Sequence, residues 1–172
     1  ITACAGRVTG MEQQDILSMT LPELQAAVQE LGEPKFRAKQ IFNWLHQKRV
    51  TDFSEMTTLS LPFRERLASD FCINRLKIAK RLASSVDDTV KYLYELPDGN
   101  YVETVCMQYH HGTSLCISTQ VGCRMGCRFC ASAIAGFVRN LTPAEMLLQI
   151  YETERAQNCK ISSLVLMGIG EP

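Results

Sequence analysis

Hydrophobic residues within positions 35–48 recur at the three- and four-residue spacing of an amphipathic helix. The residues that share this face are Ala38, Ile41, Phe42 and Leu45. Two more helices are indicated by start signals: "TLPE" at 20–23 is a capping box with proline in its first turn, and "SLPF" at 60–63 begins a similar run. We therefore predict a small helical domain over residues 12–73, with Trp44 in or beside its core.

The pattern changes to β structure further along the chain. Three stretches are rich in Val, Leu, Ile and Tyr, at residues 76–84, 89–96 and 101–108. The sequence "PDGN" at 97–100 is a turn signal between the second and the third stretch. These features predict an antiparallel β segment. The "HHG" sequence that begins at His110 is assigned to the next loop, although neighbouring imidazoles can also bind a metal.

The last part of the chain alternates strand and helix signals. The sequence "SLCIST" at 114–119 predicts a strand, and "TPAE" at 142–145 is a second capping box. The helix that it opens carries the apolar residues Met146, Leu147, Ile150 and Tyr151. The apolar run "SLVLMG" at 163–168 is typical of a buried parallel strand. This βαβ order predicts an α/β fold, in which chemistry gathers at the C-terminal ends of the strands.

Composition limits the class of protein. The chain has 172 residues, 46% of them hydrophobic, which suits one domain or one small domain plus part of a second. It has no run of roughly 20 apolar residues for a membrane span and no signal-peptide layout. The chain begins with Ile1, whereas Met11 opens a segment that resembles a natural start. We therefore interpret residues 1–10 as a non-native or disordered leader and the chain as a fragment.

Charge is balanced overall but unevenly distributed. The 18 basic residues offset the 18 acidic ones, so the net charge is zero. Residues 35–81 nevertheless contain eleven basic and four acidic side chains, a local charge of +7. A basic block of this kind can attract a polyanion such as RNA. It can equally be the solvated surface of ordinary helices.

Three of the eight cysteines are crowded into the sequence "GCRMGCRFC" at 122–130. Cys123, Cys127 and Cys130 have the spacing C-x3-C-x2-C. Without a secretion signal, such crowding favours metal binding over disulfides. Structural zinc and ordinary iron–sulfur clusters both take four protein ligands. Two interpretations follow: a zinc site completed by Cys116 or His111, or a 4Fe–4S cluster with one iron left open for a small molecule.

The C-x3-C-x2-C spacing resembles the signature of the radical S-adenosylmethionine (SAM) superfamily. This resemblance implies that Cys123, Cys127 and Cys130 bind a 4Fe–4S cluster and that the open iron chelates SAM, which is split to give a radical. The sequence "GIGEP" at the end of the chain resembles the glycine–glutamate motif of the superfamily. By this resemblance Gly170 and Glu171 contact the amino group of SAM, since a carboxylate suits an ammonium.

The chain closely resembles the radical SAM methyltransferases of ribosomal RNA that modify adenine C2. Four stretches carry this resemblance: "CISTQVGCRMGCRFCASAIAGFVRNLTPAEMLLQI", "LGEPKFRAKQIFNWLH", "YVETVCM" and "MGIGEP". Bacterial members of that family also modify some transfer RNAs. The resemblance implies that Glu103 is the general base that removes the C2 proton. It implies that Cys116 is the resolving cysteine, which releases the RNA by forming a transient disulfide. The methyl-carrying cysteine of the family has no counterpart in this chain, so we expect the fragment to be inactive alone.

The resemblance also implies a domain plan and partners. The expected parts are a leader at 1–10, a helical accessory RNA-recognition domain at 11–75, a β-rich connecting segment at 76–112 and the start of a truncated partial (β/α)6 radical SAM barrel at 113–172. The candidate RNA contacts are Lys35, Arg37, Lys39, Lys48 and Arg49, and Trp44 is a candidate for base stacking.

For the intact enzyme we expect ribosomal RNA and transfer RNA as partners, an electron donor such as flavodoxin, no membrane, a monomeric state and a cytoplasmic location. The alternatives are a methyltransferase specific for adenine C8, another radical SAM enzyme, or a non-catalytic RNA-binding module stabilised by zinc.

Overall fold

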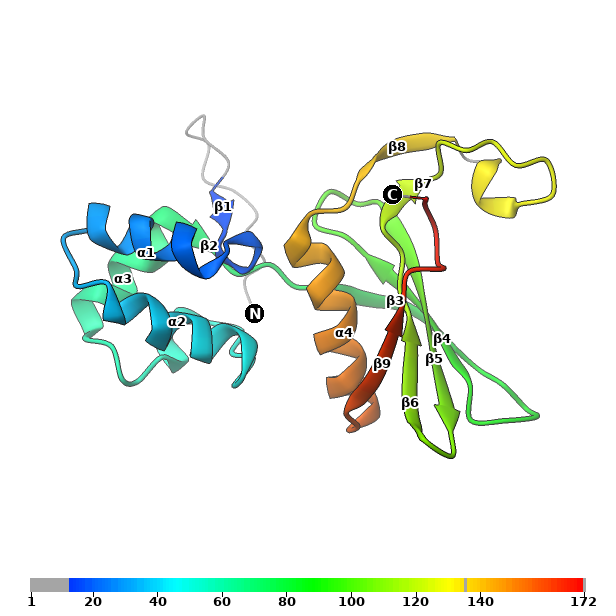
Figure 1. Cartoon of the computed structure of the whole chain (residues 1–172), viewed down its shortest axis with the longest axis horizontal. Coiled ribbons are helices and arrows are strands. Elements are labelled where there is room, and N and C mark those ends of the chain that lie inside the picture. Colours follow the sequence, from blue (N-terminus) through cyan, green and yellow to red (C-terminus); the bar gives the residue numbers. More distant parts are fainter. Residues whose placement is uncertain (1–12, 135, 172) are drawn as a thin grey trace. The chain divides into compact units, whose positions relative to one another are not determined.

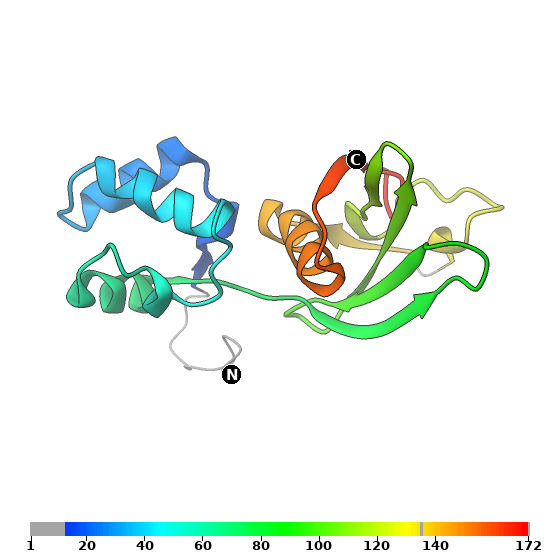
Figure 2. The same ribbon diagram turned by 90° about the horizontal axis from the view of Figure 1, so that it is seen from below.

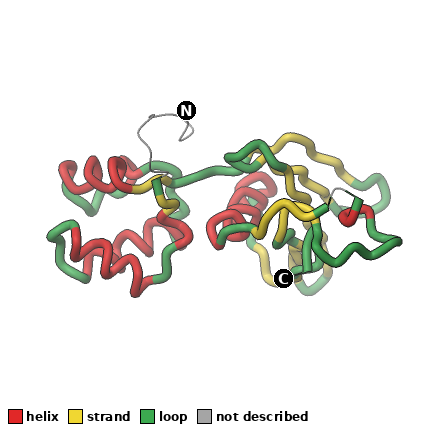
Figure 3. Tube along the Cα trace, turned by 90° about the horizontal axis from the view of Figure 1, so that it is seen from above, coloured by secondary structure: helices red, strands yellow, loops and turns green. Residues whose placement is uncertain are grey.

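The structure is a computed structural model that describes residues 13–134 and 136–171. The leader predicted at residues 1–10 lies outside these described residues. The chain divides into two compact units between Asn74 and Arg75, and each is described by itself. Figure 3 shows the contrast between them, since helices dominate the first unit and strands the second. No helix in the described ranges has the length and apolar character needed to cross a membrane.

Within the described residues, the first unit contains three α-helices, where helices were predicted, and two short 3-10 turns (Figure 1). Its elements are β1 (Gln14–Asp15), a 3-10 turn (Ile16–Ser18), α1 (Leu21–Glu30), α2 (Phe36–His46), a 3-10 turn (Phe53–Glu55), α3 (Leu61–Asp70) and β2 (Phe71–Cys72). The capping box that opens α1 is confirmed, because the backbone N–H of Thr20 donates to the Glu23 carboxylate over 2.7 Å. Strands β1 and β2 pair in parallel and join the two ends of the unit.

The core of this unit follows the predicted helical pattern, with one difference. Ala38, Ile41 and Leu45 of α2 are buried at 0–1% exposure. Phe42, predicted on the same face, is half-exposed, and its ring lies 4.2 Å from that of His46. Phe42 lies at the margin of the apolar stripe, where the helix surface turns away from the core.

The second unit contains a five-stranded sheet in the order β3-β4-β5-β6-β9. Its strands are β3 (Lys77–Ala83), β4 (Val90–Glu95), β5 (Tyr101–Tyr109), β6 (Gly112–Cys116) and β9 (Ile161–Val165). The first three confirm the predicted antiparallel segment. Strands β6 and β9 are parallel, and α4 (Pro143–Gln157) connects them. A separate antiparallel pair is formed by β7 (Gln120–Gly122) and β8 (Phe137–Asn140).

Helix α4 lies against one face of this sheet (Figures 1 and 2). The capping box predicted at its start is confirmed, because the Glu145 backbone N–H donates to the Thr142 hydroxyl. The four apolar residues predicted on this helix, Met146, Leu147, Ile150 and Tyr151, are only half-buried, and the buried face of the helix is largely polar. Gln149 and Thr153 are both 0% exposed. The Thr153 hydroxyl lies 2.8 Å from that of Tyr94 on β4.

The polar face of α4 is satisfied by specific partners. The Gln149 amide oxygen accepts from the Thr104 hydroxyl over 2.8 Å and from the Ser118 backbone N–H over 2.9 Å. The Gln149 amide nitrogen donates to the Ser118 carbonyl over 3.0 Å. The buried Glu152 carboxylate pairs with Arg75 and Arg155. Because a buried polar group that loses its hydrogen-bond partner is costly, these bonds favour one register of α4 on the sheet.

The run at 163–168 differs from its prediction as a buried strand. Strand β9 ends at Val165, and Leu164 and Leu166 are 44% and 49% exposed. The reason is topological, since β9 is at the edge of the described sheet and pairs with β6 alone. An edge strand leaves one side of its backbone and part of its side chains uncovered.

We predict that Gln149→Leu destabilises the second unit by about 2–4 kcal/mol, because it leaves buried groups of Thr104 and Ser118 without a partner. Urea unfolding followed by circular dichroism measures the change. Gln157→Leu is the matched control, since that side chain is half-exposed in the last turn of the same helix. Equal midpoints for the two variants would contradict the assigned role of Gln149.

Candidate active site

The cysteine motif lies in the loop between β7 and β8, and the two strands hold its ends together. Gln120 pairs with Asn140 and Val121 with Arg139, and the Cys123 N–H donates to the Gly136 carbonyl over 3.2 Å. Gly122 has a φ of +69°, and a Cβ there would lie 1.7 Å from the Gly136 oxygen. Only glycine allows the two backbones to approach this closely.

A charged cluster fixes the return strand of the loop. The Arg139 guanidinium donates to the Asp98 carboxylate over 2.6 Å and to the Glu145 carboxylate over 2.8 Å. Glu145 is 6% exposed, and the hydrogen bonds to Glu145 and Asp98 raise the pKa of Arg139. Arg139 therefore joins β8 to the β4–β5 turn and to the first turn of α4. The contact with Asp98 was not anticipated from the sequence, because Asp98 lies 41 residues before Arg139.

The three motif thiols are half-exposed and free of disulfides. Cys123, Cys127 and Cys130 all lie in this one loop, and the Cys130 N–H donates to the Cys127 carbonyl over 3.1 Å. Hydrogen bonds from the Ser132 backbone and hydroxyl lower the pKa of Cys130. A lowered pKa favours the thiolate, which is the form that binds metals.

The donor set thus fits a metal centre in type, spacing and accessibility. The structure does not bring the three thiols together as a ligand set, because residues 13–134 and 136–171 contain no group of three or more His, Cys, Asp or Glu side chains placed to hold a metal ion. The zinc site considered with Cys116 or His111 is likewise not gathered within those residues.

The "GIGE" segment after β9 lies beside residues 117–120, which lead into the cysteine loop. The Ile169 carbonyl accepts from the N–H groups of Thr119 and Gln120 over 2.9 and 3.1 Å. Gly170 has a φ of +112°, and a Cβ there would lie 2.6 Å from the Thr119 hydroxyl. The Glu171 N–H donates to the Gln120 side chain over 3.3 Å, and the residue is exposed. The two predicted SAM contacts therefore lie next to the start of β7.

Glu103 and Cys116 lie on the same face of the sheet. Cys116 of β6 is directly opposite Val105 of β5, two residues beyond Glu103. Paired residues share a face, and diagonal neighbours in an antiparallel pair lie about 7–8 Å apart. The opposite face carries Thr104 and Tyr94, which contact α4. Both candidate residues are half-exposed on the face away from α4.

Sequence reasoning missed a partner of Glu103. The Lys91 Nζ lies 2.7 Å from the Glu103 Oε1, with both side chains 41% exposed. Lys91 is on β4, in a strand whose alternation gave no sign of an ion pair. The Lys91–Glu103 pair can be recognised only from the strand register. Leu93 is directly opposite Glu103, so Lys91 is its diagonal neighbour.

The remaining described cysteines occupy other environments. Cys72 is buried in the first unit, and Cys106 is buried on the α4 side of the sheet. Burial, followed by the nearby Cys159, raises the pKa of Cys106 to about 11. A thiol with a raised pKa is a weak nucleophile and a weak ligand at neutral pH.

The candidate RNA-contacting residues of the first unit differ in whether their side chains contact other residues. Lys35, at the N-cap of α2, and Lys39, within the helix, are exposed, whereas Arg37 donates to Gln40 over 2.9 Å. The Lys48 Nζ lies 3.4 Å from the centre of the Trp44 ring. The indole N–H of Trp44 donates to Thr58 over 2.8 Å, so this half-exposed ring lies beside the core, as predicted.

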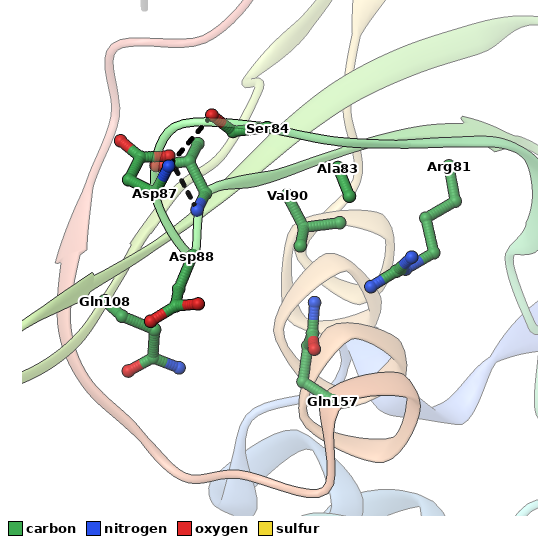
Figure 4. Close-up of a pocket in the computed structure, with 9 residues that line it drawn as sticks. Arg81, Ala83, Ser84, Asp87, Asp88, Val90, Gln108 and Gln157 are labelled. Carbon is green, nitrogen blue, oxygen red and sulfur yellow. Dashed lines mark hydrogen bonds between the residues drawn. The ribbon is translucent and has the colours of Figure 1, made fainter.

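Figure 4 shows a pocket in the second unit that contains none of the candidate residues. It is lined by Arg81, Ala83, Ser84, Asp87, Asp88, Thr89, Val90, Gln108 and Gln157. Asp87 accepts from the Thr89 N–H over 3.0 Å, so its carboxylate serves the turn between β3 and β4. The pocket is therefore formed largely by this turn and the ends of the two strands that it connects.

Comparison with known proteins agrees with the features of both units. Residues 14–73 match the "Ribosomal RNA large subunit methyltransferase N-terminal domain" family. The chain is 54% identical over 164 residues to a "Probable dual-specificity RNA methyltransferase RlmN" from Lachnoclostridium phytofermentans, covering 94% of this chain and 45% of that protein. It is 52% identical over 162 residues to the protein of the same name from Alkaliphilus oremlandii, covering 94% of this chain and 47% of the relative.

A solved structure is also similar to this chain. A radical SAM methyltransferase from Sphaerobacter thermophilus matches with a TM-score of 0.82 and 35% identity, over 92% of this chain and 48% of that one. The α/β fold is therefore that of a radical SAM methyltransferase over the part compared. The chain spans about half the length of the relatives it matches. Over that half, the chain is similar to proteins named as probable dual-specificity RNA methyltransferases RlmN, and residues 14–73 match the N-terminal domain family.

Proposed function

We propose that the chain is part of a radical SAM enzyme that methylates C2 of an adenine in large-subunit ribosomal RNA and in some transfer RNAs. The observation that carries this proposal is the 54% identity to an RlmN protein across a stretch that includes the cysteine motif, Glu103 and Cys116. The common face of Glu103 and Cys116 supports it. In this proposal residues 113–172 are the start of a partial (β/α)6 barrel, and residues 76–112 are the β-rich segment that connects it to the first unit.

Cys123, Cys127 and Cys130 would hold the cluster, since thiolates are its usual protein ligands. Gly170 and Glu171 would receive the amino group of SAM beside the start of β7. The 4Fe–4S cluster and SAM, when bound, supply a carbon radical. Adenine C2 is an electron-poor aromatic carbon without a lone pair. It therefore cannot be methylated by direct nucleophilic attack of C2 on the SAM methyl group.

Glu103 and Cys116 would act after carbon transfer to the base. Glu103 would accept the C2 proton as a general base, and a half-exposed carboxylate is accessible to the ring. The Cys116 thiolate would then attack the sulfur of the protein–RNA linkage and form a disulfide with the methyl-carrying cysteine, in a step related to thiol–disulfide exchange. The bond between that sulfur and the methylene carbon breaks, its electron pair leaves with the carbon attached to the base, and this carbon takes a proton to become the methyl group. That second cysteine has no counterpart among these residues.

The first unit would recognise RNA through its basic residues, as the name of its family suggests. Lys35 and Lys39 are exposed, as phosphate contacts must be. We further propose an electron donor such as flavodoxin and a monomeric enzyme. We also propose a cytoplasmic location, because free thiols persist in a reducing compartment.

We predict that Cys123→Ala, Cys127→Ala and Cys130→Ala each abolish SAM cleavage in a full-length enzyme containing this sequence, with a loss of bound iron. Each variant removes one of only three thiolates with the required spacing. Iron and sulfide analysis after anaerobic purification provides the measurement. Cys159→Ala is the matched control, as a half-exposed cysteine outside the motif. A colourless wild-type protein with one zinc would support the non-catalytic alternative instead.

We predict that Cys116→Ala permits SAM cleavage but traps the enzyme covalently joined to RNA, because alanine has no sulfur to form the releasing disulfide. The adduct is an RNase-sensitive slow band on a denaturing gel. Glu103→Gln should trap an adduct one step earlier, because the C2 proton is retained. Cys106→Ala, on the opposite face of the neighbouring strand, is the control. Normal methylated RNA from Cys116→Ala would leave Cys116 as an ordinary strand residue.

We predict that Lys35→Glu and Lys39→Glu each weaken RNA binding and lower the slope of log K against log salt by about 1, because each phosphate contact releases counterions. Filter binding at several salt concentrations measures this slope. SAM cleavage without RNA should be retained. Arg66→Glu is the control, as an exposed basic residue on α3 rather than α2. Equal slopes for all three variants would identify the basic face of α2 as an ordinary solvated surface.

A further inference from the structure

Lys91 contacts the proposed general base directly. Its Nζ lies 2.7 Å from the Glu103 Oε1, across the β4–β5 pair. The register places Leu93 opposite Glu103 and Lys91 opposite Val105, so Lys91 reaches Glu103 along the diagonal of the sheet. Within the part of the chain that the structure describes, this is the one polar partner of the Glu103 carboxylate.

The same register joins Lys91 to the candidate resolving cysteine. Val105 pairs with Lys91 on one side and with Cys116 on the other. These three residues therefore form one row across β4, β5 and β6, with Glu103 beside it. Because α4 contacts the opposite face through Tyr94 and Thr104, the row lies on the face away from the helix.

We propose that Lys91 is a positioning residue that holds the Glu103 carboxylate for removal of the adenine C2 proton. The inference rests on the function proposed for Glu103. A glutamate side chain has three rotatable bonds, and an unpaired carboxylate on an open face samples many positions. The Lys91 ammonium occupies one carboxylate oxygen and leaves the other to accept the proton. During that step the C2 proton passes to Glu103, and Lys91 keeps all of its own protons.

The ion pair is suited to positioning rather than to stabilising the fold. Both side chains are 41% exposed, and pairs of this kind contribute only about 0–1 kcal/mol to stability. A displacement of about 1 Å in a catalytic group can nevertheless slow a reaction about 100-fold. Loss of the Lys91 charge should therefore change the reaction much more than it changes folding.

The test compares Lys91→Gln, Lys91→Arg and Lys77→Gln in the full-length enzyme supplied with SAM, reductant and the RNA substrate. Lys91→Gln should lower kcat for RNA methylation about 10- to 100-fold, accumulate the protein–RNA adduct and leave KM for RNA within about twofold. Lys91→Arg should recover most of kcat, since it restores the cation. Lys77→Gln should behave as wild type, because Lys77 pairs with Glu95 over 3.8 Å and is 70% exposed on the same sheet.

Two further measurements separate the inference from the proposed function. In a Glu103→Gln background, Lys91→Gln should cause no additional loss, because the carboxylate that it positions is gone. Normal turnover by Glu103→Gln would refute the base assignment itself. If Glu103→Gln stalls while Lys91→Gln turns over normally, the positioning role of Lys91 is wrong. A raised dissociation constant for RNA with unchanged kcat in Lys91→Gln would overturn it too, because Lys91 would then be an RNA contact.

Discussion

The arrangement of the second unit depends on the hydrogen bonds made by Ser118, a residue with 0% exposure. Its backbone N–H and carbonyl bond the Gln149 side chain of α4 over 2.9 and 3.0 Å. Its hydroxyl donates to the Glu103 carbonyl over 2.6 Å and accepts from the Ile169 N–H over 3.0 Å. One residue therefore fixes the helix, the strand of the proposed base and the segment that follows β9. An incomplete buried polar network is destabilising, so loss of one of these four hydrogen bonds should weaken the others.

This network also decides which face of the sheet is available for chemistry. Gln149 and Thr153 bring α4 onto the face of Thr104 and Tyr94, and that face is filled. The alternation of a strand then places Glu103 and its neighbours on the other face. A polar helix face suits this task, because directional bonds set one register, whereas apolar contacts tolerate sliding.

The parts of the fold predicted correctly from the sequence are those with local causes. The capping box at Thr20 is complete within four residues, so no distant contact is needed to recognise it. The face of α4 was missed because Gln149 and Thr153 resemble solvent-exposed residues until their partners on β4, β5 and residue 118 are known. The edge position of β9 follows from strand order, which local hydrophobicity does not encode.

The candidate site likewise contains residues that can be recognised from local sequence and residues that can be recognised only from tertiary contacts. The three cysteines are recognisable by their spacing alone, which needs no distant contact, although the described structure does not gather their thiols as a ligand set. Glu103 and Cys116 lie on different strands, and only the β5–β6 register shows that they share a face. Lys91 pairs with Glu103 on the neighbouring strand and Arg139 with Asp98, 41 residues earlier, so neither contact belongs to a local motif. Residues that orient a site are therefore the ones for which tertiary structure adds most, because their role exists only as a contact.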